Sequence, residues 1–150
     1  MPTKNHILIG LSESDKTQFG KEPFTQQSTP QKVFSSIWAL ESEVNNGGFA
    51  QYFLNSSCET AAFVSEALET IGASKTADIC RRAIAAAFPT GLPEKREDIS
   101  AAAADFSDEV IEALEPLTIE SFEYPDNLTD LLFAYVSKHQ EEFGELQKAD

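Results

Sequence analysis

Apolar residues recur through this sequence at the spacing of helix turns, and prolines, glycines and capping residues separate one such stretch from the next. The first clear stretch begins at Thr29-Pro30, since Thr is a good N-cap and Pro is favoured in the first helical position. The apolar positions that follow fall on one face of a helix; they are Val33, Phe34, Ile37, Trp38 and Val44. We expect Asn46, Gly47 and Gly48 to end this helix, because Gly tolerates the left-handed conformation that closes one.

The same signals predict further helical segments along the chain. They are two turns from Phe49 to Asn55, a helix from the capping box of Ser56 and Glu59 to Gly72, one from the cap Ser74 to Pro89, one over Glu94 to Ala104, one from the cap Ser107 to Pro116, a single turn over Thr118 to Phe122, and a last long helix capped by Asp126. We find no convincing strand beyond a doubtful one, or a turn of helix, near Ile7. The sequence predicts a single compact all-α domain of about six or seven helices over residues 29–150, with an irregular N-terminal arm over 1–28.

The charge of the chain restricts its partners. Its 150 residues include 25 acids and 11 bases, a net charge of −14. Binding to nucleic acid or to an anionic membrane needs clustered Lys and Arg, so neither is expected. The longest apolar run, Ala83 to Phe88, is far shorter than the roughly 20 residues of a membrane span. With no apolar signal segment at the N-terminus either, we expect a cytoplasmic protein with a basic partner.

The acids are concentrated in the second half of the chain. Residues 1–93 hold 9 acids and 7 bases, whereas residues 94–150 hold 16 acids and 4 bases. In the helix that Ser107 begins, Asp108, Glu112 and Glu115 share one face, which we expect to lie opposite an apolar face of Val110, Ile111 and Leu114. The candidate partner-binding surface is this acidic set: Asp98, Asp105, Asp108, Glu109, Glu112, Glu115, Glu120, Glu123, Asp126 and Asp130.

Signals for catalysis, metal binding or a cofactor are weak. His6 and His139 lie 133 positions apart without neighbouring ligands, and His139 fits a structural role at the end of the last helix. Cys58 and Cys80 each lie within a helical pattern and are expected to be reduced, partly buried small side chains. The sequence contains no nucleophile elbow and no phosphate-binding glycine loop. We therefore expect no catalytic residue, no metal and no cofactor.

One segment, Glu43 to Asn55, has an unusual composition of amides, glycines and aromatic residues. The glycines permit a tight corner between two helices, the aromatic side chains anchor it in the core, and the amides can satisfy backbone groups at the helix ends. The alternative is a small polar pocket lined by Gln51 and Asn55. We interpret the segment as a structural motif, whose members are Asn45, Asn46, Gly47, Gly48, Phe49, Gln51, Phe53 and Asn55.

This motif, together with Ala67-Leu68 and Ile71-Gly72-Ala73, resembles a bacterial all-helical domain family that includes acidic DNA-mimic proteins. The segment from Tyr124 to Phe143 also fits the pattern of the family, so the resemblance covers roughly residues 30–143. It implies an α-helical fold, dimerisation and, in some members, binding to a DNA-binding protein in place of DNA. The shared motif is the corner, and it does not identify a partner.

The leading hypothesis is a non-enzymatic DNA mimic that occupies the DNA-binding surface of a basic protein, such as a transcription factor or nucleoid protein. The first alternative is an immunity-type inhibitor of a basic toxin or nuclease, which needs the same electrostatics. The second is a small-molecule binder or enzyme that uses the corner from Asn45 to Asn55. A homodimer is expected from the resemblance and from 15 aromatic residues that one small core would not fully cover.

Overall fold

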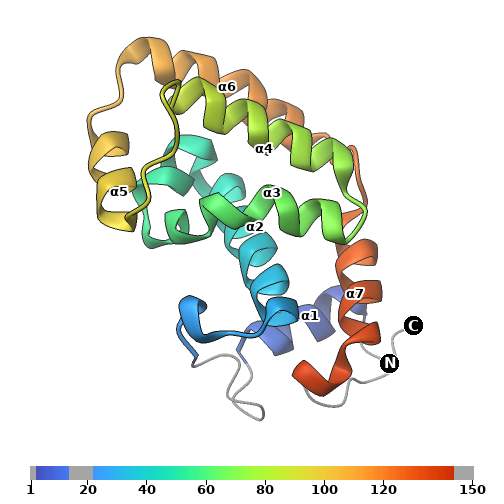
Figure 1. Cartoon of the computed structure of the whole chain (residues 1–150). Coiled ribbons are helices and arrows are strands. Elements are labelled where there is room, and N and C mark those ends of the chain that lie inside the picture. The colour runs from blue at the N-terminus through green and yellow to red at the C-terminus, as the bar shows by residue number, and fades with distance from the viewer. Residues whose placement is uncertain (1–2, 14–21, 144–150) are drawn as a thin grey trace.

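The computed structural model describes residues 3–13 and 22–143, and these residues form helices and connecting turns without any strand (Figure 1). Helices make up 79% of the structure, which confirms the predicted all-α class. The α-helices are α1 (Lys4–Ser12), α2 (Thr29–Leu54), α3 (Ala61–Thr70), α4 (Ser74–Ala87), α5 (Arg96–Ala104), α6 (Asp108–Phe122) and α7 (Leu128–Lys138). Three 3₁₀ turns complete the fold: η2 (Phe24–Gln26), η3 (Ser56–Thr60) and η4 (Gln140–Glu142).

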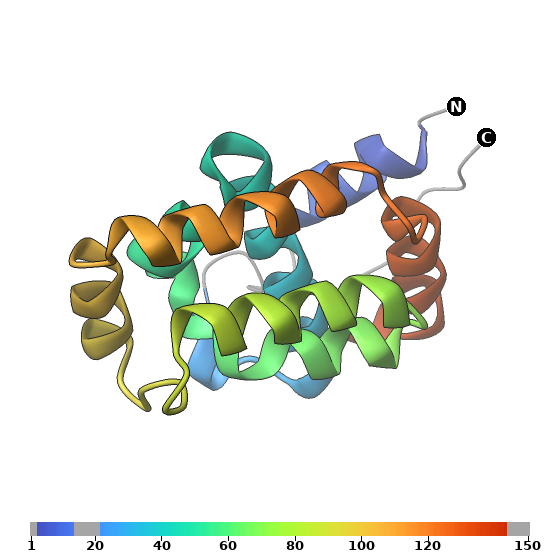
Figure 2. The same ribbon diagram turned by 90° about the horizontal axis from the view of Figure 1, so that it is seen from above.

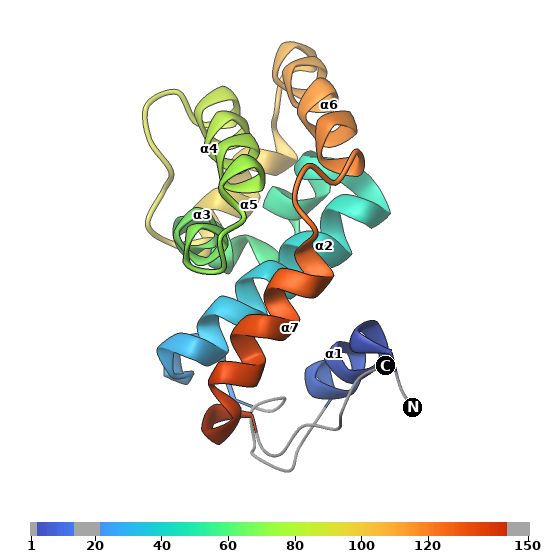
Figure 3. The same cartoon turned by 90° about the vertical axis from the view of Figure 1, so that its right-hand side faces the viewer.

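Helix α2 is the central element, against which α3, α5, α6 and α7 pack. Helices α4 and α6 lie side by side and run antiparallel, and α5 closes one end of this pair (Figures 1 and 2). At the other end of the molecule, α7 lies along the first part of α2 and also contacts α1 (Figure 3). The acid-rich half of the chain therefore forms an outer layer over α2.

The start of α2 differs by one residue from the prediction. Ser28, and not Thr29, is the N-cap, and it forms a capping box with Gln31. The Ser28 hydroxyl accepts from the Gln31 backbone N–H at 3.4 Å, and the Gln31 side chain accepts from the Ser28 N–H at 3.0 Å. Such reciprocal bonds satisfy two donors that a bare helix end would leave free.

The predicted corner is present within α2, because the chain bends at Gly48 between two helical segments. Gly48 has φ 79° and ψ −175° within an element that continues to Leu54. Figure 3 shows the last part of α2 bending away from the axis of the first. The break between two helices was therefore predicted at the correct place.

Helix α6 is longer than predicted, because it continues through Pro116. A proline inside a helix removes one hydrogen bond and normally ends or kinks it. Here the neighbouring Leu114 and Leu117 are both buried, and α6 packs on both α2 and α4. We attribute the uninterrupted helix to this packing on either side of the proline. The predicted single turn over Thr118 to Phe122 is the second half of the same helix.

Three of the predicted caps were also wrong. Ser74 is the first residue of α4, whose N-cap is Ala73, and it makes no side-chain cap. Ser56 begins the 3₁₀ turn η3 and makes no side-chain cap, and the next α-helix begins at Ala61. Asp126 does not cap α7, whose N-cap is Asn127. The Asp126 carboxylate instead accepts from the backbone N–H and hydroxyl of Thr76 in the first turn of α4, at 2.8 and 2.9 Å. It thus satisfies a free donor of a helix 50 positions earlier.

The N-terminal segment contains a helix, although an irregular arm was expected over residues 1–28. Thr3 caps α1, with its hydroxyl accepting from the His6 N–H at 3.1 Å. Leu8 and Leu11 of this helix belong to the buried core. Residues 14–21 of the arm lie outside the described part.

Aromatic side chains fill the centre of the molecule. Phe53 has no exposed surface, and its ring lies 5.2 Å from that of Phe88 and 5.4 Å from that of Tyr52. Phe49 and Phe106 surround the same ring at 6.4 and 6.3 Å. The second half of α2 is therefore held to the end of α4 and the start of α6 by one aromatic cluster.

Among the described helices, none combines the length and apolarity required to cross a lipid bilayer.

Candidate functional site

The outer side of α6 carries the largest group of exposed carboxylates in the described part of the acid-rich half. Ser107 begins the helix by accepting from the Val110 N–H at 3.2 Å, which places Asp108 and Glu109 in the first turn. Helical spacing then brings Glu112, Glu115 and Glu123 to the exposed side. At a rise of 1.5 Å per residue, the 15 residues of α6 span about 22 Å.

Seven of the ten predicted acidic residues make no ion pair among the residues that the structure describes, and all seven are exposed. We call this set the acidic surface: Asp98, Asp105, Asp108, Glu109, Glu112, Glu115 and Glu123. It covers α6 and the adjoining helix α5, which meet at one end of the molecule (Figure 1). Their charges are available to a partner.

The other three predicted residues are engaged within the chain. Glu120 pairs with both terminal nitrogens of Arg82, at 2.6 and 3.0 Å, and this hydrogen bonding lowers the pKa of the Glu120 carboxyl. Asp130 pairs with Lys4 at 3.1 Å. Asp126 is committed to the first turn of α4, as described above. These three carboxylates hold elements together.

The arrangement of charge on α6 does not favour the stability of this helix. Asp108 and Glu112 are like charges at i and i+4, which repel each other. Glu123 is the C-cap, where the helix dipole favours a cation, and the last turn contains no base. Only the acids of the first turn are well placed for the dipole. Most of the acidic surface therefore does not stabilise α6 itself.

Apolar side chains lie among these carboxylates. Ile111, Ile119 and Phe122 are 45%, 55% and 47% exposed. The prediction that Ile111 points inward was wrong, whereas Leu114 is buried as expected and Val110 is half-buried. The exposed positions of Ile119 and Phe122 were missed because the helix was expected to end at Pro116. In one continuous helix, their spacing from Ile111, at i+8 and i+11, places all three side chains on the same side.

The kink in α2 faces the middle of α6. Because Gly48 interrupts the helix, the backbone N–H of Phe49 is free to donate to the Thr118 hydroxyl, at 3.2 Å. A Cβ added at Gly48 would lie 3.1 Å from that same oxygen. Gly48 is required here both for its positive φ and for the close approach of the two helices.

The amides of the motif close the kink on its other side. Gln51 and Asn55 both donate to one carboxylate oxygen of Glu43, at 2.8 and 2.9 Å. A Cβ added at Gly47 would lie 2.0 Å from the Gln51 side-chain oxygen, so the lack of a side chain at Gly47 leaves room for this arrangement. These bonds join the turns before and after Gly48 and occupy the amides that the pocket hypothesis required.

A groove of about 340 Å³ runs between the kink and α6. On one side its lining is the motif from Val44 to Ala50, and on the other it is α6. The α6 side includes Ile111 and Phe122 together with Glu115 of the acidic surface. The structure thus brings the motif and part of the acidic surface together, which the sequence reasoning had treated separately.

We expect Gly48→Ala to destabilise the protein by about 2–3 kcal/mol, because φ 79° with ψ −175° is essentially restricted to glycine and the new methyl group meets Thr118. Urea unfolding measures the change. Gly10→Ala is the matched control, since nothing lies within 4 Å of its added Cβ and helical Ala is favoured over Gly. Equal stability of the Gly48 variant and the wild type would contradict the strain at the kink.

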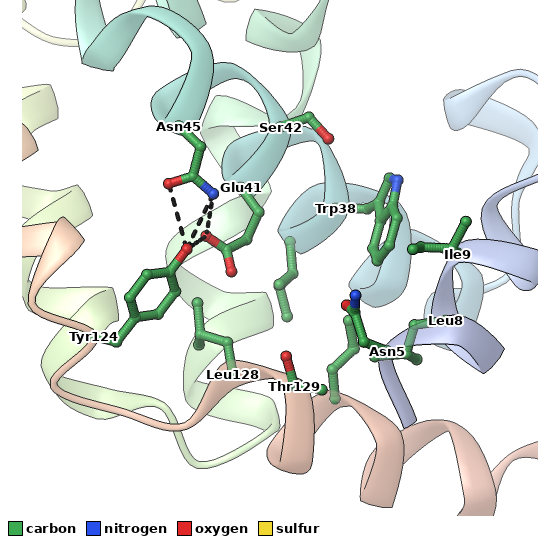
Figure 4. A pocket seen from close by; sticks show the side chains of 12 residues that line it. Asn5, Leu8, Ile9, Trp38, Glu41, Ser42, Asn45, Tyr124, Leu128 and Thr129 are labelled. Atoms are coloured by element: carbon green, nitrogen blue, oxygen red, sulfur yellow. Dashed lines mark hydrogen bonds between the residues drawn. The ribbon is translucent and has the colours of Figure 1, made fainter. Parts of the chain in front are cut away.

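A second polar cluster joins α2 to the segment after α6. The Tyr124 hydroxyl donates to Glu41 at 3.2 Å, and the Asn45 amide donates to the Tyr124 oxygen at 3.0 Å (Figure 4). Tyr124 has φ 48°, a left-handed conformation that is uncommon for a bulky residue. Burial raises the pKa of the Glu41 carboxyl, although its hydrogen bonds with Tyr124 and Asn45 partly oppose this.

At a pH above the folded-state pKa of Glu41, Glu41→Gln is expected to stabilise the protein by less than about 1 kcal/mol. In that pH range the wild type must keep a partly desolvated charge. When folding raises the pKa of a carboxyl, the protein loses stability as the pH rises from the unfolded-state pKa to the folded-state pKa, because the folded state disfavours the charged form. The advantage of the variant should therefore grow over that window and then stay constant. Urea unfolding of both proteins between about pH 4 and pH 8 measures it. An advantage that is independent of pH would contradict the raised pKa.

The remaining candidate residues have structural surroundings. Cys58 and Cys80 are free and buried, and burial raises the pKa of the Cys80 thiol to about 12, which disfavours the reactive thiolate. His139 is the C-cap of α7, stacks on Tyr135 at 4.3 Å, and its Nδ1 lies 2.8 Å from the Tyr135 carbonyl oxygen. Within the described residues, no group of three or more His, Cys, Asp or Glu is placed to hold a metal ion.

The fold and this site together define an all-helical protein with an unpaired acidic surface. A family model described as DMP19-like protein matches residues 25–139, so the chain belongs to the DMP19-like family. The family takes its name from a DNA-mimic protein and is generally non-enzymatic. This confirms the resemblance drawn from the motif. No curated protein and no solved structure matches the chain.

Proposed function

We propose that this protein is a DNA mimic that occupies the DNA-binding surface of a basic DNA-binding protein, such as a transcription factor or nucleoid protein. The observation that carries the proposal is the acidic surface, seven exposed carboxylates without ion pairs among the described residues. Membership of the DMP19-like family supports the same class of function.

The mechanism is competition for the cationic groups of the partner. A protein that binds duplex DNA neutralises phosphates with Lys and Arg and releases condensed counterions. Carboxylates along about 22 Å of α6 offer those Lys and Arg side chains alternative anions. DNA carries one charge per about 1.7 Å of axis, so the carboxylates of α5 and α6 must act together.

The groove beside α6 adds a contact that phosphates cannot supply. Ile111 and Phe122 line it and are nearly half exposed. An apolar side chain of the partner inserted there would be surrounded by charge pairs at the rim, the usual anatomy of a specific interface. Specificity for one basic protein among many then comes from the groove, while the carboxylates supply attraction.

Affinity capture tests the proposal. The immobilised protein is incubated with a native lysate at low salt, and bound proteins are released first with duplex DNA and then with high salt. DNA-binding proteins released by the DNA step are the expected result. A captured toxin or nuclease that duplex DNA does not release would favour the immunity-type alternative. Capture of no basic protein would contradict the mimic.

We also propose that the protein forms a homodimer, as the family resemblance implies. The exposed apolar side chains Leu54 and Ile119, which do not line the groove beside α6, support a further buried contact. Light scattering at tens of micromolar should report about twice the chain mass of 16.5 kDa. A mass of one chain would contradict the dimer and leave the mimic proposal standing.

A further inference from the structure

A pocket of about 370 Å³ is lined by residues of α1, α2 and α7 and by Tyr124, which follows α6 (Figure 4). Its apolar lining comes from all three helices, as Leu8, Ile9, Ile37, Trp38, Leu128 and Leu132. Its polar lining is the cluster of Glu41, Asn45 and Tyr124, together with Asn5, Ser42 and Thr129. The volume lies at the lower end of the range for small-molecule sites, and the lining has their usual mixture of apolar walls and a few polar groups.

Glu41 supplies the formal charge of this pocket, since the lining contains no Lys, Arg or His. Its Oε2 accepts from Tyr124 at 3.2 Å and from Asn45 at 3.4 Å. Its Oε1 accepts no hydrogen bond from the described residues, and Figure 4 shows it directed away from Asn45. One carboxylate oxygen is thus held in place while the other is left for a ligand.

Two further observations indicate a prepared site. Tyr124 keeps its left-handed backbone conformation, and such strain persists where surrounding structure maintains it, often at binding sites. Trp38 is fixed by stacking on Phe34, with ring centroids 5.4 Å apart. A fixed indole and a fixed carboxylate in one pocket form a suitable pair of groups for an organic cation.

We propose that this pocket binds an organic cation, a guanidinium or ammonium group on a short apolar stem. The cationic head pairs with Oε1 of Glu41, and the stem packs between Trp38 and the leucines of α1 and α7. An anion is disfavoured because nothing in the lining would balance its charge. A hard metal ion is disfavoured because the pocket offers it a single carboxylate among apolar walls. Binding of this cation does not require the DNA-mimic function.

The test uses the fluorescence of Trp38, which is the single tryptophan of the chain. Butylguanidinium is titrated into the full chain, with the neutral and similarly shaped butylurea as a control ligand. We expect a saturable change with butylguanidinium and at least a tenfold weaker response to butylurea. A capped Gly-Arg-Gly peptide, titrated in parallel, shows whether the cation is a free small molecule or the side chain of a protein, and saturable binding of either supports the proposal.

Variants assign the effect to the carboxylate. Glu41→Gln keeps the shape of the side chain and should weaken binding of butylguanidinium about 10- to 100-fold, since a hydrogen bond to a charged group is lost. Tyr124→Phe keeps the ring and should cause a smaller loss, because Tyr124 only positions Glu41. Glu66→Gln, an exposed glutamate of α3, is the matched control and should bind as the wild type does. Calorimetry repeats the titration without relying on Trp38. Absence of saturation with both cationic probes, or equal binding by Glu41→Gln and wild type, would overturn the proposal.

Discussion

Replacing Asp108, Glu112 and Glu115 together with lysine is expected to weaken binding to the captured partner at least about a hundredfold. Each change removes an attractive charge and places a like charge against the cationic surface of the partner, and such juxtapositions cost several kcal/mol. All three side chains are exposed and make no ion pair among the described residues, so the helical fold should be retained. Binding is measured across a salt series, and helix content by circular dichroism.

The matched control for this variant changes the same amount of charge elsewhere. Glu13, Glu66 and Glu141 are also exposed and lie outside the acidic surface, at the C-cap of α1, on α3 and on η4. Their triple replacement by lysine raises the net charge equally and should reduce affinity only through the weak long-range field. Equal losses in the two variants would show that net charge alone drives binding. Wild-type affinity in the first variant would show that this part of α6 is only a solvated surface.

Phe53→Ala is expected to destabilise the protein by about 3–5 kcal/mol, which is the usual cost of removing a fully buried aromatic ring. Phe53 has no exposed surface and contacts the rings of Phe49, Tyr52, Phe88 and Phe106. Its loss would leave a cavity where α2, α4 and the start of α6 meet. The free energy of unfolding in urea measures the effect.

Phe122→Ala provides the comparison, because it deletes the same ring at a position that is 47% exposed. Its stability should stay within about 0.5 kcal/mol of wild type. Its partner binding should nevertheless weaken, since Phe122 lines the groove beside α6. The two variants therefore separate a ring that maintains the fold from one assigned to recognition. A large loss of stability in Phe122→Ala would contradict its place on the surface.

The helical class followed from periodicity, whereas several boundaries did not. Apolar spacing identified the helices containing Val33, Ile79 and Leu132, because each of these helices buries one face in the shared core. Local capping signals were less reliable, since Ser56 and Asp126 resemble caps in sequence but serve other contacts. Pro116 was interpreted as a stop, and only packing of α6 on both sides of it shows why the helix continues.

The candidate site was predictable in part for a similar reason. Exposed carboxylates follow from helical spacing, so Asp108, Glu112 and Glu115 could be placed on one side of a helix from the sequence. The partners of Glu120 and Asp126 could not, because Arg82 and Thr76 lie 38 and 50 positions away. The pocket at Glu41 joins residues from α1, α2 and α7, and no local pattern predicts such a meeting.

DNA mimicry requires that this protein and DNA bind the same surface of one partner. A competition titration tests it most directly: labelled protein is titrated with the captured partner at several fixed concentrations of the DNA that this partner binds. Competition for one surface predicts that the apparent Kd rises linearly with the DNA concentration and that no complex contains all three molecules. A ternary complex, or an apparent Kd that DNA leaves unchanged, would contradict it.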